Sequence, residues 1–341
     1  MKDFNSIFGL TFEQTKVLFS LQRLITNKDC YYSIANRGGL FSNTNESKRK
    51  FDWMKEWDSS ITLYLQKLSG KENVNLLYSE SDIRELIFMI DSKSETTIWK
   101  YLVLLECVLY VPYYPVNEDL DVYKKKYKGL KLNKGKRRET LVSICGLLSI
   151  NFKYIDVFDK AYSKAFKSLS GFWTKVALSA GIGMIVILIA ILTFQYEIIT
   201  LFAAQGLSGA AAVSAGLAAL GGGAVALGGF GMAGGFVVLI GGGSLLGISA
   251  GGALGFSIAS LGADAVLTEA AKMQVVLTEI VLAIQKDTKA FQEILFNIQR
   301  QNLSLKQELE RLKAQSNHDK KKIKNLEKSI EYLEKLIKAN L

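Results

Sequence analysis

Apolar residues recur at helical spacing through most of the first 170 residues, and polar stretches separate these runs. The first run opens with Thr11 and places Gln14 three positions later, which is a capping-box pattern. Another stops ahead of Pro112, a residue that cannot continue a helix. Strand-like alternation is rare, so the pattern predicts an all-α fold with a helical domain over residues 1–170. The expected helical runs are 11–26, 79–93, 97–111 and, as two helices, 139–166, and the polar stretch 27–50 is expected to be a loop.

The middle of the chain is almost free of charge. Residues 176–263 are 88 residues with one charged side chain, Glu197. Their first part, 176–196, is 21 uncharged residues and is long enough as a helix to cross a bilayer core of about 30 Å. A soluble core does not need so long an uncharged stretch, so the sequence predicts a membrane domain over residues 171–263. Two long passes with a re-entrant helix or four short passes both fit this length, and four are slightly favoured.

Glycine fills the second part of this segment, with 19 glycines between residues 206 and 262. In water each glycine costs a helix about 1 kcal/mol relative to alanine, whereas in a membrane small residues let helix backbones approach closely. The spacing of four predicts glycine-zipper packing, either within a hairpin of one chain or between helices of several subunits that line a path. No GK[ST] triplet follows the glycines, which excludes a phosphate-binding loop. The zipper glycines are Gly231, Gly235, Gly243, Gly247, Gly251 and Gly255.

The tail, residues 264–341, contains no glycine and no proline and keeps a heptad of apolar residues. A straight helix over 277–341 would be about 97 Å long. Isoleucine at a, leucine at d and Asn302 at a favour a parallel dimer of two chains. The alternative is an antiparallel hairpin that turns at 315–319, where both core positions are polar. The register is carried by Asn302, Leu309, Leu312, Ile323, Leu326, Ile330 and Leu333.

The net charge of +10 lies mainly in the N-terminal part, where the first 175 residues carry 28 basic and 20 acidic side chains. Residues 124–138 hold nine basic residues in fifteen, which indicates either a solvated loop or docking on anionic lipid headgroups; nucleic acid is a weaker alternative. Lysines before the uncharged segment predict that the N- and C-terminal parts are both cytoplasmic, on an inner or plasma membrane. The expected lipid-docking residues are Lys124, Lys125, Lys126, Lys128, Lys134, Lys136, Arg137 and Arg138.

Few residues could carry chemistry. The chain has one histidine, His318, and three widely spaced cysteines without a CxxC pair, so we expect no metal site, no cofactor and no enzyme activity. The cysteines are expected to be reduced and buried. Glu197 either marks the membrane interface or, if the segment buries it, becomes a candidate ion or proton site. The N-terminus lacks an apolar signal-peptide region, so the membrane segment itself is expected to direct insertion.

Two resemblances add to this interpretation. The run AAAVSAGLAALGGGAVALGGFGMAGG, residues 210–235, is similar to the glycine- and alanine-rich region of the interferon-inducible small membrane-protein family. The larger plan, a helical domain, one hydrophobic block and then long helices, resembles the α-helical cytolysins. These likenesses imply a membrane-embedded helical region and pore formation, and they assign no individual residue.

Together the patterns predict a homo-oligomeric membrane protein whose tail sets the number of subunits and whose zipper packs the membrane helices. The first hypothesis is an effector that perturbs or permeabilises a membrane, in phage defence or a toxin-like role. The second is a membrane-anchored coiled-coil scaffold or tether that recruits a protein partner through the N-terminal domain. The third is a soluble pore former that shelters its hydrophobic block until it is triggered.

Overall fold

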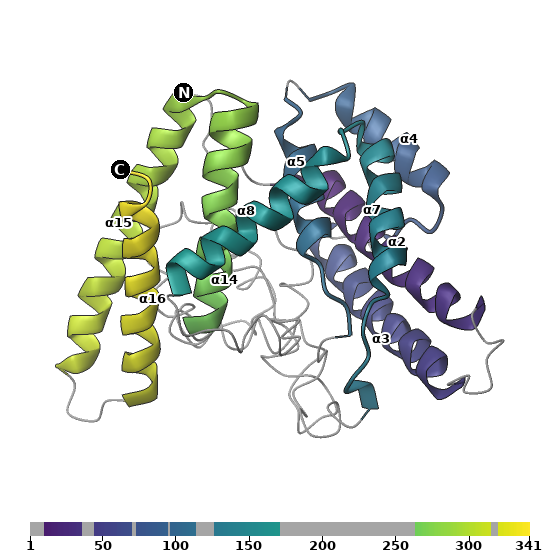
Figure 1. The fold of residues 1–341 in the computed structure, drawn as a ribbon, viewed down its shortest axis with the longest axis horizontal. Helices are drawn as coiled ribbons and strands as arrows, with labels where there is room; N and C mark the ends of the chain where they lie inside the picture. The colour runs from purple at the N-terminus through teal and green to yellow at the C-terminus, as the bar shows by residue number, and fades with distance from the viewer. Residues whose placement is uncertain are drawn as a thin grey trace. The chain divides into compact units, whose positions relative to one another are not determined.

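The computed structural model describes residues 10–35, 44–69, 73–94, 96–113, 126–170, 263–314 and 320–341. Every regular element within these ranges is a helix, which confirms the all-α class (Figure 1). Contacts divide the described residues into two compact units. We call residues 10–156 the N-terminal unit, and residues 157–170 with 263–341 the C-terminal unit.

The N-terminal unit is built around helix α2, Phe12–Ala35, which packs against four other helices. Its first turn has the predicted capping box, because the Thr11 amide donates to Gln14 Oε1 at 2.9 Å and the Gln14 amide donates to Thr11 Oγ1 at 3.3 Å. Its apolar face is buried from Val17 to Ile25, as the periodicity predicted, and Phe12 in the first turn is half-buried. The surrounding helices are α3 (Thr44–Ser69), α4 (Glu80–Asp91), α5 (Ile98–Leu109) and α7 (Lys134–Leu148), and α8 (Lys153–Ser170) follows.

Aromatic side chains form the centre of this core. Trp53 and Trp57 lie one turn apart on α3, with stacked rings whose centroids are 6.2 Å apart. Phe19 of α2 meets Trp57 edge-on, and Tyr113 meets Trp53 in the same way. Such pairs add to the large apolar area that each ring buries, so this cluster fixes α3 against α2.

The loop predicted over residues 27–50 is wrong. Helix α2 continues to Ala35, and α3 begins at Thr44. The prediction failed because polar residues in this stretch form hydrogen bonds inside the fold. Ser33 Oγ donates to the Asp29 carbonyl oxygen at 3.0 Å. Asp29 and Cys30 are buried and continue the buried face of α2.

Caps and turns define the remaining helix ends. Ser79 caps α4 by accepting from the Asp82 amide at 3.1 Å, and Asn133 caps α7 by accepting from the Lys136 amide at 3.0 Å. At the other end of α7, Ser149 adopts the left-handed conformation with φ 56°.

No single helix within the described ranges is long and apolar enough to cross a membrane. Helices α7 and α8 reach the required length and apolar character only as a pair, and this pair is bent by 115°.

The C-terminal unit contains α14 (Ala263–Val275), the π-helix η2 (Val276–Ile284), α15 (Thr288–Lys313) and α16 (Lys320–Lys338). The single straight helix expected over 277–341 is therefore divided. One break lies at Lys286, whose φ is 55°, and another follows Lys313. A non-glycine residue in the left-handed region costs about 1–2 kcal/mol. The next residue, Asp287, offsets part of this cost by capping α15, since its Oδ1 accepts from the Ala290 amide at 2.9 Å.

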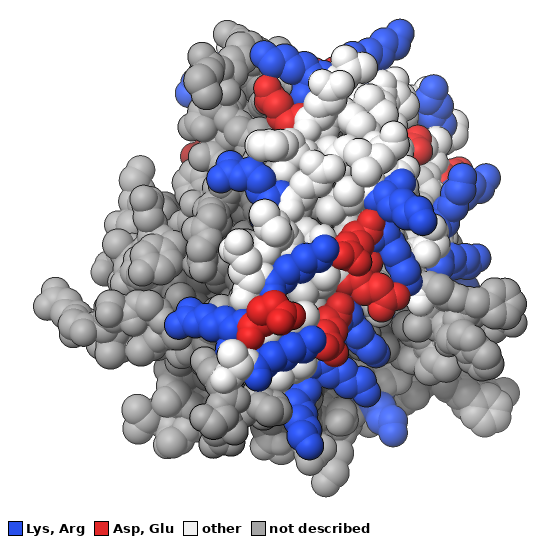
Figure 2. Space-filling view, turned by 90° about the vertical axis from the view of Figure 1, so that its left-hand side faces the viewer, with Lys and Arg blue, Asp and Glu red and all other residues white. Residues whose placement is uncertain are grey.

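Helices α15 and α16 lie side by side and antiparallel (Figure 1). Lys306 is ion-paired with Glu334 at 2.6 Å and Lys313 with Glu327 at 2.9 Å, so later positions on one helix meet earlier positions on the other. Acidic and basic side chains are interspersed on the described surface that this side of the molecule presents (Figure 2). Within one chain the tail thus forms the hairpin alternative, although its connection at 315–319 lies outside the described residues.

Candidate functional site

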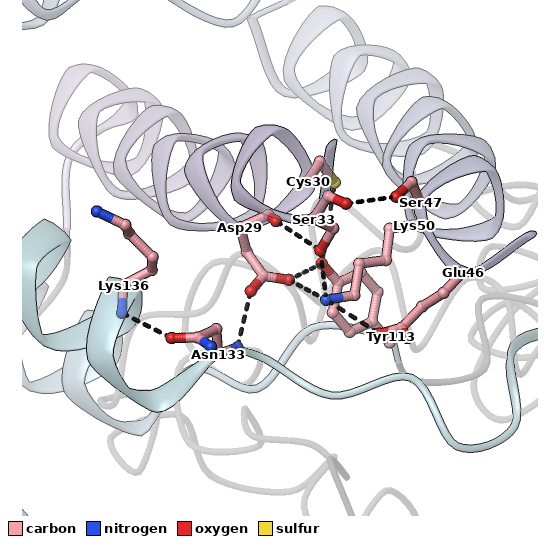
Figure 3. A network of polar contacts seen from close by, with 9 residues as sticks. All are labelled: Asp29, Cys30, Ser33, Glu46, Ser47, Lys50, Tyr113, Asn133 and Lys136. Atoms are coloured by element: carbon pink, nitrogen blue, oxygen red, sulfur yellow. Dashed lines mark hydrogen bonds and ion pairs between the residues drawn. The ribbon is translucent and has the colours of Figure 1, made fainter. Parts of the chain in front are cut away.

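A buried carboxylate, Asp29 of α2, joins four segments of the N-terminal unit (Figure 3). One oxygen, Oδ2, accepts from Lys50 Nζ of α3 at 2.7 Å and from the Tyr113 hydroxyl at 2.6 Å. The other, Oδ1, accepts from the backbone amide of Asn133 at 2.7 Å, directly before α7. We call this set the Asp29 clamp: Asp29, Lys50, Tyr113 and Asn133.

The Lys50 ammonium, like the Asp29 carboxylate, has several polar partners. It also donates to Ser33 Oγ at 3.1 Å and lies 3.5 Å from Glu46 Oε1, one turn earlier on α3. Ser47 Oγ donates to the carbonyl oxygen of Ser33 at 2.9 Å, which ties α3 to α2 a second time. A buried charge pair is stable only when further hydrogen bonds satisfy both partners, and this one meets that condition.

The Asp29 clamp joins these four segments through buried polar contacts. Burial raises the pKa of the neighbouring Cys30 thiol to about 12, and burial also raises the pKa of Tyr113 well above its usual range. Both groups therefore stay protonated at neutral pH. No group of three or more potential metal ligands gathers anywhere in the part of the chain that the structure describes.

A second set of contacts fixes the segment that leads into α7. Arg49 of α3 donates to the carbonyl oxygen of Lys126 at 2.5 Å and to that of Lys128 at 2.7 Å. Glu56, two turns further along α3, accepts from Lys126 Nζ at 2.6 Å and from the Tyr127 hydroxyl at 2.9 Å. The segment is thus anchored at its start by α3 and at Asn133 by the Asp29 clamp. We call residues 126–138 the basic strap.

Four of the predicted lipid-docking residues are engaged by the protein itself. Lys126 pairs with Glu56, which raises the pKa of the lysine, and Lys136 lies 2.5 Å from Glu139 Oε2 and over the Tyr32 ring. Arg137 donates to the carbonyl oxygen of Val108, and Arg138 makes a two-point ion pair with Asp156 at 2.7 and 2.9 Å.

Three lysines of the strap, Lys128, Lys131 and Lys134, are exposed and have no ion pair within the described ranges. Lys128 and Lys134 belong to the predicted docking set, whereas Lys124 and Lys125 lie outside the described residues. The strap therefore presents unneutralised positive charge on a segment whose backbone is pinned. A pinned strap loses less conformational freedom on binding than a free loop would.

The start of α7 adds to this positive field. Its first turn contains no acidic residue and begins with Lys134, so the positive end of the helix dipole and the basic side chains reinforce one another. The Asn133 cap offsets part of the resulting cost by satisfying the Lys136 amide. A shallow depression beside the strap is lined by Lys28, Tyr31, Tyr32 and Lys136 together with Asn27, Glu139 and Thr140.

The heptad residues lie together in the C-terminal unit, within a single chain. Asn302, Leu309, Leu326, Ile330 and Leu333 are buried, and Leu312 and Ile323 are half-buried. The zipper glycines Gly231 to Gly255 and Glu197 lie outside the described residues.

Sequence reasoning missed the Asp29 clamp and the anchoring residues Arg49 and Glu56. Asp29 and Lys50 stand in the stretch that we expected to be a loop, and nothing in their local pattern marks them. A helix extended past residue 27 would have placed Asp29 next to the buried Thr26 and Cys30, which is the signal that a charged residue at such a position needs a partner.

No protein-family model, curated protein or solved structure matches the chain.

Proposed function

We propose that this protein is an oligomeric membrane effector that inserts residues 176–263 into an anionic bilayer and permeabilises it. The observation that carries the proposal is the uncharged segment itself, with 88 residues, one charge and glycines at a spacing of four. Such a segment has no place in water, and its small residues suit close helix packing in lipid.

The basic strap supports an anionic target. Lys128, Lys131 and Lys134 extend from a pinned backbone and are not neutralised by the described acidic residues. Each lysine or arginine near an anionic membrane surface contributes about 1 kcal/mol of attraction. The N-terminal unit in this proposal approaches the headgroups through the strap and brings the uncharged segment to the bilayer.

The zipper supports association between the inserted helices. Gly243, Gly247, Gly251 and Gly255 fall on one helix face, and close backbone contact along that face assembles a bundle from several subunits. A charged or bulky residue on the face would separate the helices. The permeabilising unit is therefore the zipper face, and Glu197 marks the end of the first span.

The test compares dye release from vesicles that contain phosphatidylserine by the full chain and two variants. Gly247→Leu alters the zipper face, and Gly252→Leu places the same side chain off that face as the matched control. We expect release to fall about tenfold or more for Gly247→Leu and to change little for Gly252→Leu. Equal release by the unaltered chain and Gly247→Leu contradicts the permeabilising bundle.

The tether and the sheltered pore former give different results. A tether resists extraction from membranes by alkaline carbonate but releases no dye, and its function survives exchange of 176–263 for an unrelated hairpin. A sheltered pore former appears in the soluble fraction until it is triggered. Carbonate extraction of the full chain therefore comes before the dye assay.

A further inference from the structure

The heptad register of the tail continues through the first helix break, where the polar Thr288 holds the a position. Leu277 and Ile284 hold d positions before the break, and Phe291 and Leu295 continue the same register after it. No glycine or proline stands between residues 264 and 341 to end a helix. Apart from the polar core positions Thr288, Ser316 and Asp319, this register suits one continuous coiled-coil helix, whereas the structure folds the tail back.

The junction combines a strained residue with a helix cap, because Asp287 Oδ1 accepts from the Ala290 amide at 2.9 Å where α15 begins. Lys286 has φ 55°, a left-handed conformation that a non-glycine residue rarely adopts. The preceding nine residues, Val276–Ile284, form a π-helix, with the Gln285 amide donating to the carbonyl oxygen of Ile280 at 2.9 Å. Runs of π-helix this long are rare because they pack the backbone poorly. Conversion of this stretch to α-helix relieves both features.

The hairpin also leaves a buried polar group unsatisfied. Asn302 is 5% exposed, and its Oδ1 has no hydrogen-bond partner in the described structure. An asparagine at an a position of a parallel dimer meets the same asparagine of the second helix, where each amide can donate to the other. Ile323 and Ile337, at a in α16, are only half-buried in the hairpin, so it covers these positions incompletely.

We propose that the folded-back tail is one of two states, and that a second copy of this chain captures the other, a continuous parallel coiled coil over residues 277–341. The biological role of this exchange rests on the proposed function, in which several copies assemble; the exchange itself rests on the tail.

Opening the hairpin has a defined consequence for the C-terminal unit. The turn that directly follows α16 is tied to α14 by two hydrogen bonds between Gln274 and Asn340, at 3.0 and 2.6 Å. Lys335 Nζ of α16 also donates to the carbonyl oxygen of Leu169 at 3.1 Å. These contacts are lost when α16 leaves. Helix α14 begins at Ala263, at the end of the uncharged segment in sequence, so α16 restrains the helix that directly follows that segment.

Disulfide cross-linking of the full chain in membranes tests the exchange. Ile330 is 6% exposed in the hairpin, so a cysteine there is buried within one chain. In a parallel dimer, position 330 is an a position, and the cysteine of Ile330→Cys faces the same cysteine of the second chain. Lys324→Cys is the matched control, because it is exposed in the hairpin and lies at b, on the outside of the dimer. We expect several times more disulfide-linked dimer for Ile330→Cys than for Lys324→Cys, with the unaltered chain and its three buried cysteines as background. Ile337→Cys should behave like Ile330→Cys only if the pair is parallel.

Reversing the charge of Lys306 should weaken the hairpin and leave the parallel dimer unaffected. Lys306 and Glu334 pair in the hairpin, but both hold e positions, and in a parallel dimer they face the uncharged Gln301 and Ser329 of the second copy. Lys306→Glu should therefore raise the Ile330→Cys cross-link about two- to fivefold. Adding Glu334→Lys restores the pair and should return the cross-link to its original level.

The outcomes separate this proposal from the proposed function. The exchange is overturned if Ile330→Cys gives no more disulfide-linked dimer than Lys324→Cys does, with or without Lys306→Glu. This holds whatever the dye assay shows. Cross-linking that responds to Lys306→Glu and to the double reversal upholds it. If such cross-linking occurs while the unaltered chain releases no dye, the exchange stands and the permeabilising function fails.

Discussion

Lys50 Nζ lies 2.7 Å from Asp29 Oδ2, and the two side chains are 3% and 1% exposed. The pair sits where α2, α3 and the segments around Tyr113 and Asn133 meet, so it connects parts of the chain that are up to 104 residues apart. Most ion pairs on a protein surface contribute little to stability, whereas loss of one partner from a buried pair leaves an uncompensated charge.

Asp29→Ala should lower the free energy of unfolding by about 3–5 kcal/mol, because the Lys50 ammonium would stay buried without its anion. Lys50→Met should cost less, since the Tyr113 hydroxyl and the Asn133 amide still donate to Asp29. Pulse proteolysis of the full chain over a urea gradient measures both. The control is Lys28→Met, which breaks a pair with Glu80 whose side chains are 40% and 38% exposed and should cost less than about 1 kcal/mol. Equal losses for all three variants contradict the role assigned to the clamp.

The three cysteines should react slowly with thiol reagents in the folded protein. Burial raises the pKa of Cys30 to about 12 and that of Cys145 to about 11 from an ordinary 9.0, and it raises the pKa of Cys107 well above its usual range. At pH 8 the reactive thiolate of Cys30 is therefore about a thousandfold scarcer than that of an exposed thiol. Absorbance with a disulfide reagent, with and without denaturant, measures the difference. Rapid reaction of any thiol in the native chain would show that burial is incomplete.

The same raised pKa values predict how stability depends on pH. Above pH 9 the unfolded chain releases thiol protons that the folded chain keeps, so the unfolded state binds fewer protons. The thiol contribution to stability is complete below pH 9 and is lost progressively as the pH rises toward 12. Urea midpoints recorded from pH 8 to 11 should fall more steeply for the unaltered chain than for Cys145→Ala.

Replacement of Lys128, Lys131 and Lys134 by glutamine should weaken the preference for anionic membranes. Three lysines at about 1 kcal/mol each correspond to about a hundredfold. The quantity to measure is the ratio of binding to phosphatidylserine vesicles over binding to neutral vesicles, because insertion of the uncharged segment contributes to both. The control removes the same charge from α16, where Lys320, Lys324 and Lys328 are also exposed. An equal fall for both triple variants indicates that net charge, not the strap, directs binding.

Lys286→Gly should favour the folded-back tail. Glycine adopts φ 55° without strain but has more freedom in the unfolded chain, so the net gain is up to about 1 kcal/mol. If the hairpin and the coiled coil exchange, this variant lowers the Ile330→Cys cross-link about two- to fivefold, the opposite of Lys306→Glu. Arg300→Gly, in the middle of α15, is the control because it removes helix propensity without relieving the junction.

Local pattern was enough to foresee α4, α5, the pair α7 and α8, and the first part of α2 with its capping box at Thr11, because these depend on neighbours three or four residues away. It missed α3 and the end of α2. It was not enough for the Asp29 clamp, whose partners lie 21, 84 and 104 residues along the chain. The composition of the basic strap revealed its positive charge. The sequence did not show that Lys126 forms an ion pair with Glu56, or that Arg138 forms one with Asp156.

The tail shows a different limit of sequence reasoning. Its a and d residues face a partner helix in both the hairpin and the dimer, so the heptad alone cannot choose between them. The break at Lys286 carries no glycine or proline, and a rule based on helix-stopping residues passes over it.

Pairing of α15 with α16 inside one chain does not depend on how many chains are present, whereas pairing between chains increases with their density in the membrane. If the tail exchanges as proposed, the fraction of joined tails rises gradually with the density of copies, because association of two chains follows mass action. A sparse membrane would then hold mostly closed chains, and a crowded one mostly joined chains.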